Sequence, residues 1–215
     1  MKKYIVILTV LACFKGYAQD PIHTQFFMIP ETLSSSFTGG KQYTRAGIIH
    51  RTQREGLKFN VNTQFAFADN WFEEVSSGIG ISVLNHQETT TRYNFTQVNL
   101  NYAYQFSISD SWNVRPSISL GYGSKDFGFQ NLILEDQINI SSGVINGTSF
   151  DPIDLDESIR FIDFSASVLF NNENSWVGIT VKHLNRPNIS MTQDGETPLD
   201  IFISAHANIE FPLYR

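Results

Sequence analysis

The chain has a single cysteine among its 215 residues, Cys13, which lies in an apolar run near the N-terminus. If that run is removed as a leader, no thiol remains, which excludes disulfides, thiolate catalysis and cysteine-bound metals. The residues Val10-Leu11-Ala12-Cys13 distantly resemble a lipoprotein box, in which Cys13 is acylated and becomes the new N-terminus. With ordinary cleavage, the secreted chain has to be held together by its own sheet.

Long apolar runs are missing beyond the N-terminus, where no stretch approaches the roughly 18 to 20 residues that a membrane-spanning helix needs. The N-terminus itself has the three parts of a secretory signal peptide. A basic start, Met1-Lys2-Lys3, is followed by the apolar run Tyr4–Phe14 and the small-residue site Gly16-Tyr17-Ala18. We therefore predict a signal peptide over residues 1–18 and a mature chain that begins near Gln19. If that chain lies in a membrane, it crosses as a β-barrel.

Positive charge and catalytic motifs are also scarce. The net charge of −6 argues against a nucleic-acid partner. The five histidines are dispersed, none forms a pair with metal-ligand spacing on one element, and no Gly-x-Ser-x-Gly sequence occurs. We therefore expect neither an enzyme nor a bound cofactor. The stretch Asp151–Glu157 has four carboxylates in seven residues and is the best calcium candidate, although charged loops are ordinary on bacterial surfaces.

The chain is rich in alternating polar and apolar residues, the period-2 pattern of a strand with one face in an apolar environment. Between Val98 and Ile108, asparagine, glutamine and serine alternate with aliphatic and aromatic residues. The pattern recurs in most extended segments, and helical periodicity is weak throughout. We predict eight strands, near Thr44–Arg51, Gly56–Ala68, Ser77–His86, Tyr93–Phe106, Trp112–Gly123, Ile159–Phe170, Trp176–Leu184 and Leu199–Phe211.

Two all-β folds share this pattern, an antiparallel up-and-down transmembrane β-barrel and a soluble β-sandwich that binds a ligand or a surface partner. A barrel alternates short turns with longer loops. The connections at 107–111 and 171–174 are short, those at 124–158 and 185–198 are long, and the first two connections run against this rule. Tryptophans at strand ends fit either an interfacial girdle or plugs of a sandwich core; these are Trp71, Trp112 and Trp176.

The two folds differ in where the apolar row points. In a barrel it forms an outward band and the polar row lines the interior, whereas in a sandwich it faces a second sheet. The apolar row consists of Phe59, Val61, Phe65, Phe67, Leu100, Tyr102, Tyr104, Leu120 and Tyr122. The polar row consists of Asn60, Asn62, Gln64, Asn99, Asn101, Gln105, Arg115, Ser117 and Ser119.

An ordered set of motifs resembles the PorP/SprF family of outer-membrane proteins, which belong to the type IX secretion and gliding machinery of Bacteroidota. The motifs are Ala18-Gln19-Asp20-Pro21, Gln25-Phe26-Phe27 with Pro30, Arg45 with Ile49-His50-Arg51-Thr52-Gln53, Gly78-Ile79-Gly80-Ile81-Ser82-Val83, Leu100-Asn101-Tyr102-Ala103-Tyr104, and Val181-Lys182-His183-Leu184-Asn185-Arg186-Pro187-Asn188.

The resemblance implies a non-enzymatic barrel in the outer membrane, in contact with its lipid, that assists secretion or surface anchoring of adhesins and meets the periplasmic motor proteins. It also implies longer relatives, so we expect either an incomplete barrel or a truncated or divergent member. The expected division is the signal peptide, an extended periplasmic segment over residues 19–43, and a barrel over residues 44–215.

The candidate partner or structural residues are Asp20, Pro21, Arg45, Arg51, Gln53, Lys182, His183, Asn185, Arg186 and Pro187. Pro187 ends a strand because it has no N–H for the ladder, and Arg186 suits a carboxylate or phosphate. This last motif is either an interface anchor or an internal loop clamp. The segment Gln19–Gly40 either plugs the lumen or meets a periplasmic partner, and Arg45 and Arg51 are expected to form salt bridges in the lumen.

Overall fold

The computed structural model describes residues 26–56, 60–128, 133, 135–140, 142–145, 147, 158–192 and 195–210. The expected signal peptide, the candidate residues Asp20 and Pro21, and the acidic stretch Asp151–Glu157 lie outside the described residues. The expected calcium site is therefore not addressed by the structure.

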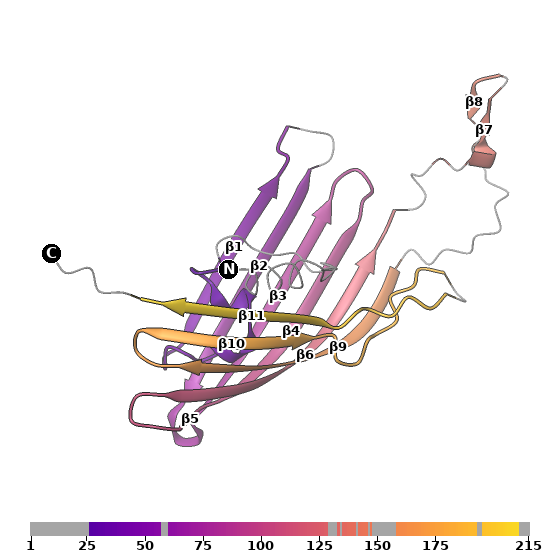
Figure 1. Cartoon of the computed structure of the whole chain (residues 1–215). Helices are drawn as coiled ribbons and strands as arrows, with labels where there is room; N and C mark the ends of the chain where they lie inside the picture. Colours follow the sequence, from indigo (N-terminus) through magenta and orange to yellow (C-terminus); the bar gives the residue numbers. More distant parts are fainter. Residues whose placement is uncertain are drawn as a thin grey trace, which may run out of the picture.

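All eight predicted strands are present, in one antiparallel sheet whose main strands follow the order of the chain (Figure 1). Each main strand pairs with the next, which is the up-and-down topology that was predicted. The main strands are β1 (Arg45–Gln53), β2 (Val61–Phe72), β3 (Ser77–Glu88), β4 (Asn94–Tyr104), β6 (Asn113–Asp126), β9 (Ser158–Asn171), β10 (Ser175–Lys182) and β11 (Phe202–Ile209). The short β5 (Phe106–Ser107) pairs with β6, and β7 (Ile138–Asn139) pairs with β8 (Val144–Ile145) in the long connection before β9.

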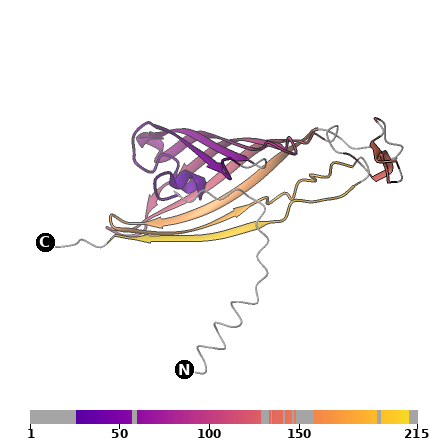
Figure 2. The same ribbon diagram turned by 90° about the horizontal axis from the view of Figure 1, so that it is seen from above.

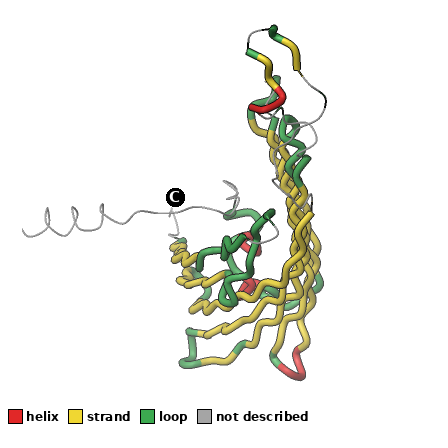
Figure 3. Tube along the Cα trace, turned by 90° about the vertical axis from the view of Figure 1, so that its right-hand side faces the viewer, coloured by secondary structure: helices red, strands yellow, loops and turns green. Residues whose placement is uncertain are grey.

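The sheet curls into a half-barrel, which is plain when it is seen from above and from the side (Figures 2 and 3). Within the described residues, β1 pairs with β2 alone and β11 with β10 alone, so both ends of the strand order are edges. The all-β, antiparallel barrel class is confirmed in the form of this half-barrel.

No helix in the described part of the chain has the length and the apolar character that crossing a membrane requires.

The connections follow the alternation better than the sequence indicated. The link between β1 and β2 spans residues 54–60, whereas β2 runs on to Phe72 and leaves only residues 73–76 before β3. Our placement of the end of β2 at Ala68 was too early, because Asp69 continues the ladder opposite Arg45. The connections after β1, β6 and β10 are therefore longer than those after β2 and β9, which lie at the other end of the sheet (Figure 1). The two connections that flank β4 do not follow this alternation, because the link from β3 spans residues 89–93 and the link to β6 spans residues 105–112.

The outer face of the sheet carries an exposed apolar row. Its side chains are 43% to 63% exposed at Ile79, Ile81, Leu100, Tyr102, Ile118, Leu120, Ile162, Phe164, Val177 and Ile179. No second sheet covers this row in the described part of the chain. The inner face instead buries small polar side chains, among them Ser82, Ser117, Ser119, Ser167 and Thr180. This is the distribution of a membrane barrel rather than of a sandwich.

The predicted faces of β2 are inverted. Phe65 was expected outside but is 6% exposed on the inner face, and Gln64 was expected inside but is exposed. The reason is that Asp69 shares the inner row with Phe65 and pairs there with Arg45. Because side chains alternate strictly along a strand, one inward carboxylate sets the direction of every side chain in β2.

Two of the three tryptophans also point inward rather than to a lipid-facing girdle. The Trp71 ring lies 5.4 Å from the guanidinium carbon of Arg115. The Trp176 ring centroid lies 5.0 Å from that of Phe37, in an edge-to-face arrangement. Both rings therefore pack against groups of the interior, and a girdle was the wrong interpretation for them.

Residues 26–44, the inner segment, fold back into the concave side of the sheet (Figures 2 and 3). They contain two short 3-10 turns, η1 (Pro30–Thr32) and η2 (Ser35–Phe37). Ser34 starts η2 by accepting a hydrogen bond from the Ser36 N–H at 3.1 Å, a short polar cap that satisfies a free backbone donor. Residues 26–40, the described part of the expected segment Gln19–Gly40, thus contact the inner face of the sheet through η2.

Candidate functional site

The inner segment is fastened first by an ion-pair cluster at the start of β1. Arg45 Nη2 pairs with Glu31 and, at 2.6 Å, with Asp69 Oδ2, while Arg45 Nε donates to Asp69 Oδ1 at 3.2 Å. The side chains of Arg45, Glu31 and Asp69 are 16%, 6% and 2% exposed. The two-point contact with Asp69 is the geometry in which guanidinium binds carboxylate best. This is the interior salt bridge expected for Arg45.

Asp69 also binds the backbone of the inner segment directly, because its Oδ2 accepts a hydrogen bond from the Gly39 N–H at 2.8 Å. The same Arg45 guanidinium reaches the Phe37 carbonyl at 3.3 Å. The cluster therefore joins η1, the end of η2 and two strands. Burial raises the pKa of Glu31, and the nearby Arg45 charge opposes that rise.

A second attachment is made by Arg115 of β6, which is 1% exposed. Its Nε donates to the Ser36 carbonyl at 2.9 Å, its Nη2 donates to the Thr38 carbonyl at 2.6 Å, and its Nη1 donates to Gln105 Oε1. The Trp71 ring lies beside the guanidinium carbon. Arg115 was predicted to point inward, and it does, but its role in holding the backbone of η2 was not predicted.

A cluster of serine hydroxyls forms the third attachment. Ser34 and Ser36 hydroxyls lie 2.9 Å from that of Ser167 on β9, and Ser36 lies 2.9 Å from Ser117 on β6. Ser117 and Ser167 are themselves 2.6 Å apart. Hydroxyls both donate and accept, so they satisfy one another in a space where larger polar groups would not fit.

Two glycines of β3 allow the inner segment to lie directly on the sheet. A Cβ added at Gly78 would stand 2.2 Å from the Thr38 carbonyl oxygen, and one added at Gly80 would stand 2.9 Å from Thr38 Cγ2. No residue with a side chain fits at Gly78 without displacing the backbone of the inner segment. In the Gly78-Ile79-Gly80 motif, the two glycines thus leave room for the inner segment on the inner face, and Ile79 is exposed on the outer face.

The Lys182–Pro187 motif begins at the last residue of β10 and is attached to the neighbouring strand β9. His183 is 3% exposed, and its Nδ1 lies 3.0 Å from Asp163 Oδ2. Asn185 accepts from the Phe164 N–H at 3.0 Å and donates to the Ile162 carbonyl at 2.7 Å. The Asn185 amide thus continues the ladder of β9 after β10 has ended, as an internal loop clamp does.

The other residues of the predicted site have separate environments. Arg186 and Asp200 pair at 3.4 Å with side chains 52% and 56% exposed. The Pro187 carbonyl accepts from the Leu199 N–H at 2.9 Å. Lys182 Nζ lies 5.6 Å from the Phe202 ring centroid. The structure therefore does not bring the predicted residues into one site, since Arg45 belongs to the ion-pair cluster, and Arg51 and Gln53 lie half-buried farther along β1.

The partners of the inner segment were largely missed from the sequence, namely Asp69, Arg115, Ser117 and Ser167. One signal was present, because a charged residue in the predicted polar row of a strand needs an opposite charge or several hydrogen-bond partners inside. The described residues contain no group of three His, Cys, Asp or Glu side chains placed to hold a metal ion.

A single curved antiparallel sheet, apolar outside and with charged and hydroxyl groups buried inside, defines a β-barrel type of membrane protein. A sequence model of the type IX secretion system membrane protein PorP/SprF matches residues 15–214. The chain belongs to this family, as its motifs had indicated. No curated protein and no solved structure matches the chain.

Proposed function

We propose that this protein is a non-enzymatic component of the outer membrane that assists the type IX system in secreting adhesins or anchoring them at the cell surface, in support of gliding, and that contacts the periplasmic machinery. The proposal rests on the family membership and on one observation. The inner segment occupies the concave side of the sheet, held by Arg45, Arg115 and the serine cluster. An occupied concave face favours an accessory or anchoring role over that of the translocation pore.

The proposed arrangement divides the chain as the sequence suggested, with residues 1–18 as signal peptide, residues 19–43 entering from the periplasmic side, and residues 44–215 in the membrane. The end with the short turns then faces the periplasm and the long connections face outward. In this arrangement, the apolar outer row meets lipid, and the segment between β6 and β9 is accessible from outside the cell.

Fractionation of cells that express the full-length chain tests the location. We expect recovery in the outer membrane, a faster-migrating form in unboiled gel samples, and cleavage of residues 124–158 when protease is added to intact cells. Recovery in the soluble periplasm would contradict the membrane location and restore the soluble binding protein as the alternative.

Surface display of adhesin in the protein's own host tests the role. We expect deletion of the gene to remove adhesin from the surface while cellular adhesin remains, and the wild-type chain to restore display. Arg45→Met, present at the same level in the membrane, is expected to restore it poorly because the inner segment is loosened. Normal display after deletion would refute the role.

A further inference from the structure

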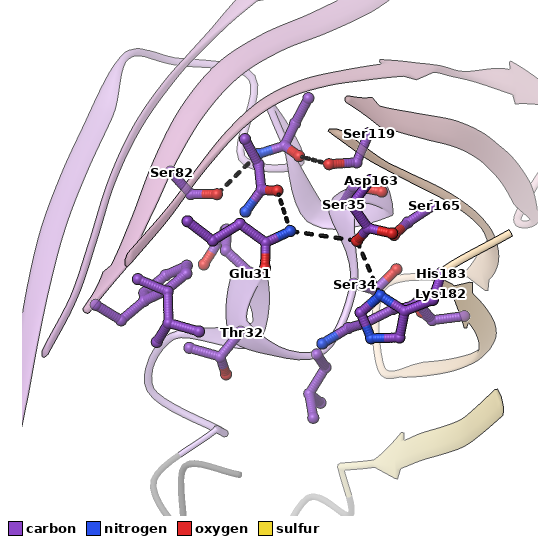
Figure 4. A pocket seen from close by; sticks show the side chains of 17 residues that line it. Glu31, Thr32, Ser34, Ser35, Ser82, Ser119, Asp163, Ser165, Lys182 and His183 are labelled. Atoms are coloured by element: carbon purple, nitrogen blue, oxygen red, sulfur yellow. Dashed lines mark hydrogen bonds and ion pairs between the residues drawn. The ribbon is translucent and has the colours of Figure 1, made fainter. Parts of the chain in front are cut away.

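Where the inner segment faces the sheet, the space between them is small and polar. Ser34 and Ser35 of the segment line the same pocket as Asp163 and His183 of the sheet side, and dashed lines mark the hydrogen bonds and ion pairs among the wall residues (Figure 4). His183 Nδ1, for example, lies 3.0 Å from Asp163 Oδ2. The volume of this pocket is about 80 Å³, which is space for a few waters only.

A larger groove lies beside the start of the inner segment, near the ends of β9, β10 and β11 (Figure 2). Its volume is about 540 Å³, within the range of about 300–1,000 Å³ that is usual for ligand sites. Phe26, Phe27 and Met28 line it from the inner segment, and the turn 172–174 lines it from the sheet. Trp176 of β10 also lines the groove.

The groove exposes apolar side chains that the sheet does not cover. Phe27 and Met28 are 70% and 68% exposed, and the Phe26 and Phe27 rings are in edge-to-face contact with centroids 6.2 Å apart. These residues belong to the inner segment and not to the apolar row on the outer face of the sheet, which the proposed arrangement places in lipid. A contiguous apolar patch outside the lipid-facing surface indicates a binding surface.

The end of the sheet around the groove is acidic. Exposed carboxylates lie in or beside the connections after β2, β4 and β9 and directly after β11, at Glu73, Glu74, Asp110, Glu173 and Glu210. In the described part of the chain, Lys41 is the only exposed cation at this end, and the ion pairs involve none of these six residues. Two of the five carboxylates, Glu173 and Glu210, line the groove together with Lys41.

The charge of the groove selects against several kinds of ligand. Arg45 and Arg115 also line it, but both guanidinium groups are held by the contacts of the inner segment described above. The charge at the rim therefore comes from Glu173, Glu210 and Lys41, and it favours a cationic ligand over an anionic lipid headgroup. A second copy of this chain is disfavoured as well, because its own acidic end would meet this one.

The neighbouring edge strand favours an extended peptide over a small cation. Ala207 and Asn208 near the end of β11 line the groove, and β11 pairs only with β10 in the described part of the chain. An extended peptide adds to such an edge by backbone hydrogen bonds, while its side chains enter adjacent pockets.

We propose that this groove binds an extended basic segment of a partner protein. An aromatic or aliphatic side chain of the segment packs against Phe27, Met28 and Trp176, and flanking Lys or Arg side chains lie beside Glu173 and Glu210. The inference deepens the proposed contact with the periplasmic machinery. It rests on that proposal for the orientation, which places this end of the sheet in the periplasm.

Selection from a library of displayed, short random peptides identifies what the groove binds. The target is the folded full-length chain in lipid nanodiscs, and peptides that also bind Phe27→Ser are removed. We expect the enriched peptides to contain more Lys and Arg than Asp and Glu, with at least one aromatic or large aliphatic residue. The most enriched peptide is then synthesised with a fluorophore, and its Kd is measured by fluorescence anisotropy.

Variants assign the binding to the groove. We expect Phe27→Ser to weaken it by about tenfold or more, because an apolar anchor contact is lost. Replacing both Glu173 and Glu210 by Gln should weaken it by about threefold or more at low salt. Ile140→Ser and Glu196→Gln are the matched controls, because both residues are exposed in connections at the other end of the sheet, and each should leave the Kd unchanged.

Ionic strength separates the two contributions to binding. Between about 0.01 M and 1 M salt, the Debye length falls from about 30 Å to about 3 Å. We therefore expect high salt to weaken binding to the wild-type chain and to remove most of the effect of the two Glu→Gln changes. The effect of Phe27→Ser should remain, since it does not depend on charge.

Three results would overturn the proposal. The first is that no peptide prefers the wild-type chain to Phe27→Ser, and the second is that the enriched peptides are neutral or acidic. The third is a dimer in light scattering that Phe27→Ser dissociates, which would assign the groove to a second copy. Heat-modifiable gel mobility checks folding, and Met28→Ser tests the same wall if Phe27→Ser does not fold.

These outcomes are distinguishable from failure of the proposed function. Peptide binding in nanodiscs does not depend on where the protein resides in the cell or on secretion. Outer-membrane residence without peptide binding would refute the groove alone, whereas peptide binding by a protein recovered from the soluble periplasm would refute only the membrane location.

Discussion

Replacement of Arg45 by methionine is expected to release the inner segment. Methionine keeps much of the length of the side chain but leaves the carboxylates of Glu31 and Asp69 buried without their cation. Both carboxylates are nearly inaccessible to solvent, with side chains 6% and 2% exposed. The free-energy cost of losing the cation therefore falls on two carboxylates that water does not screen while the inner segment is docked. Undocking of the segment reduces this cost.

The expected size of the effect follows from the burial of the pair. Removing one partner of a buried ion pair costs about 3–5 kcal/mol. Converted to an equilibrium constant, this favours the undocked segment by a factor of about 100 to 4,000. The pair of Arg186 and Asp200 has the same chemistry with side chains more than half exposed, where a salt bridge contributes about 0–1 kcal/mol. Arg186→Met is therefore the matched control.

Limited digestion with chymotrypsin reads the docking equilibrium at two places in one chain. Phe37 is 9% exposed, whereas Phe27 is 70% exposed. Cleavage after Phe37 needs the segment to open, and its rate follows the open population when reclosing is fast. In Arg45→Met we expect cleavage after Phe37 to accelerate about 100-fold or more, with cleavage after Phe27 unchanged as an internal standard.

A second substitution checks the physical cause. Adding Asp69→Asn to Arg45→Met removes one of the orphaned charges, so we expect part of the protection of Phe37 to return. Equal rates of cleavage after Phe37 in Arg45→Met and Arg186→Met would refute the reasoning, because the buried cluster would then contribute no more to docking than an exposed pair.

Three further changes test other parts of the interior. Gly78→Ala puts a Cβ 2.2 Å from a carbonyl oxygen of the inner segment and is expected to accelerate the same cleavage, while Gly147→Ala, which has open space around it, is the control. Because the pKa of Glu31 is raised above 4.5 by burial, its favourable contribution to stability is complete below pH 4.5 and is lost as pH rises through the raised pKa; Glu31→Gln should remove this slope from thermal melts. Asn185→Ala leaves two backbone groups of β9 unpaired, costs about 1–3 kcal/mol, and should speed hydrogen exchange at the Phe164 amide.

Each of these three has a result that contradicts it. Equal rates of cleavage after Phe37 in Gly78→Ala and Gly147→Ala would mean that the contact between the inner segment and β3 adjusts to an added Cβ at little cost. A wild-type melting temperature that rises relative to Glu31→Gln as pH increases would reverse the expected sign for Glu31. An unchanged exchange rate at the Phe164 amide would show that the Asn185 amide is not needed to protect the end of β9.

The seating of the inner segment illustrates what the sequence left undecided. Arg45 was recognised as an interior cation, and the segment before it as a candidate plug, from composition and position. Its partners are 14 and 24 residues away, on η1 and β2. No local pattern reports such pairings, because they depend on the curvature of the sheet and on the path of the segment across it. Arg115 and the serines of β6 and β9 were missed as attachment points for the same reason.

The sequence by itself determined the strands, their up-and-down order and the family, because period-2 alternation and turn residues act over a few positions and the motifs stand in order along the chain. Only the tertiary structure decided which way β2 faces, since both of its rows contain apolar residues and the choice came from Asp69 meeting Arg45 across the ladder. It likewise decided that two tryptophans point inward and that, in the described part of the chain, β1 and β11 are edges, because inward packing and sheet curvature arise from contacts between residues far apart in the chain.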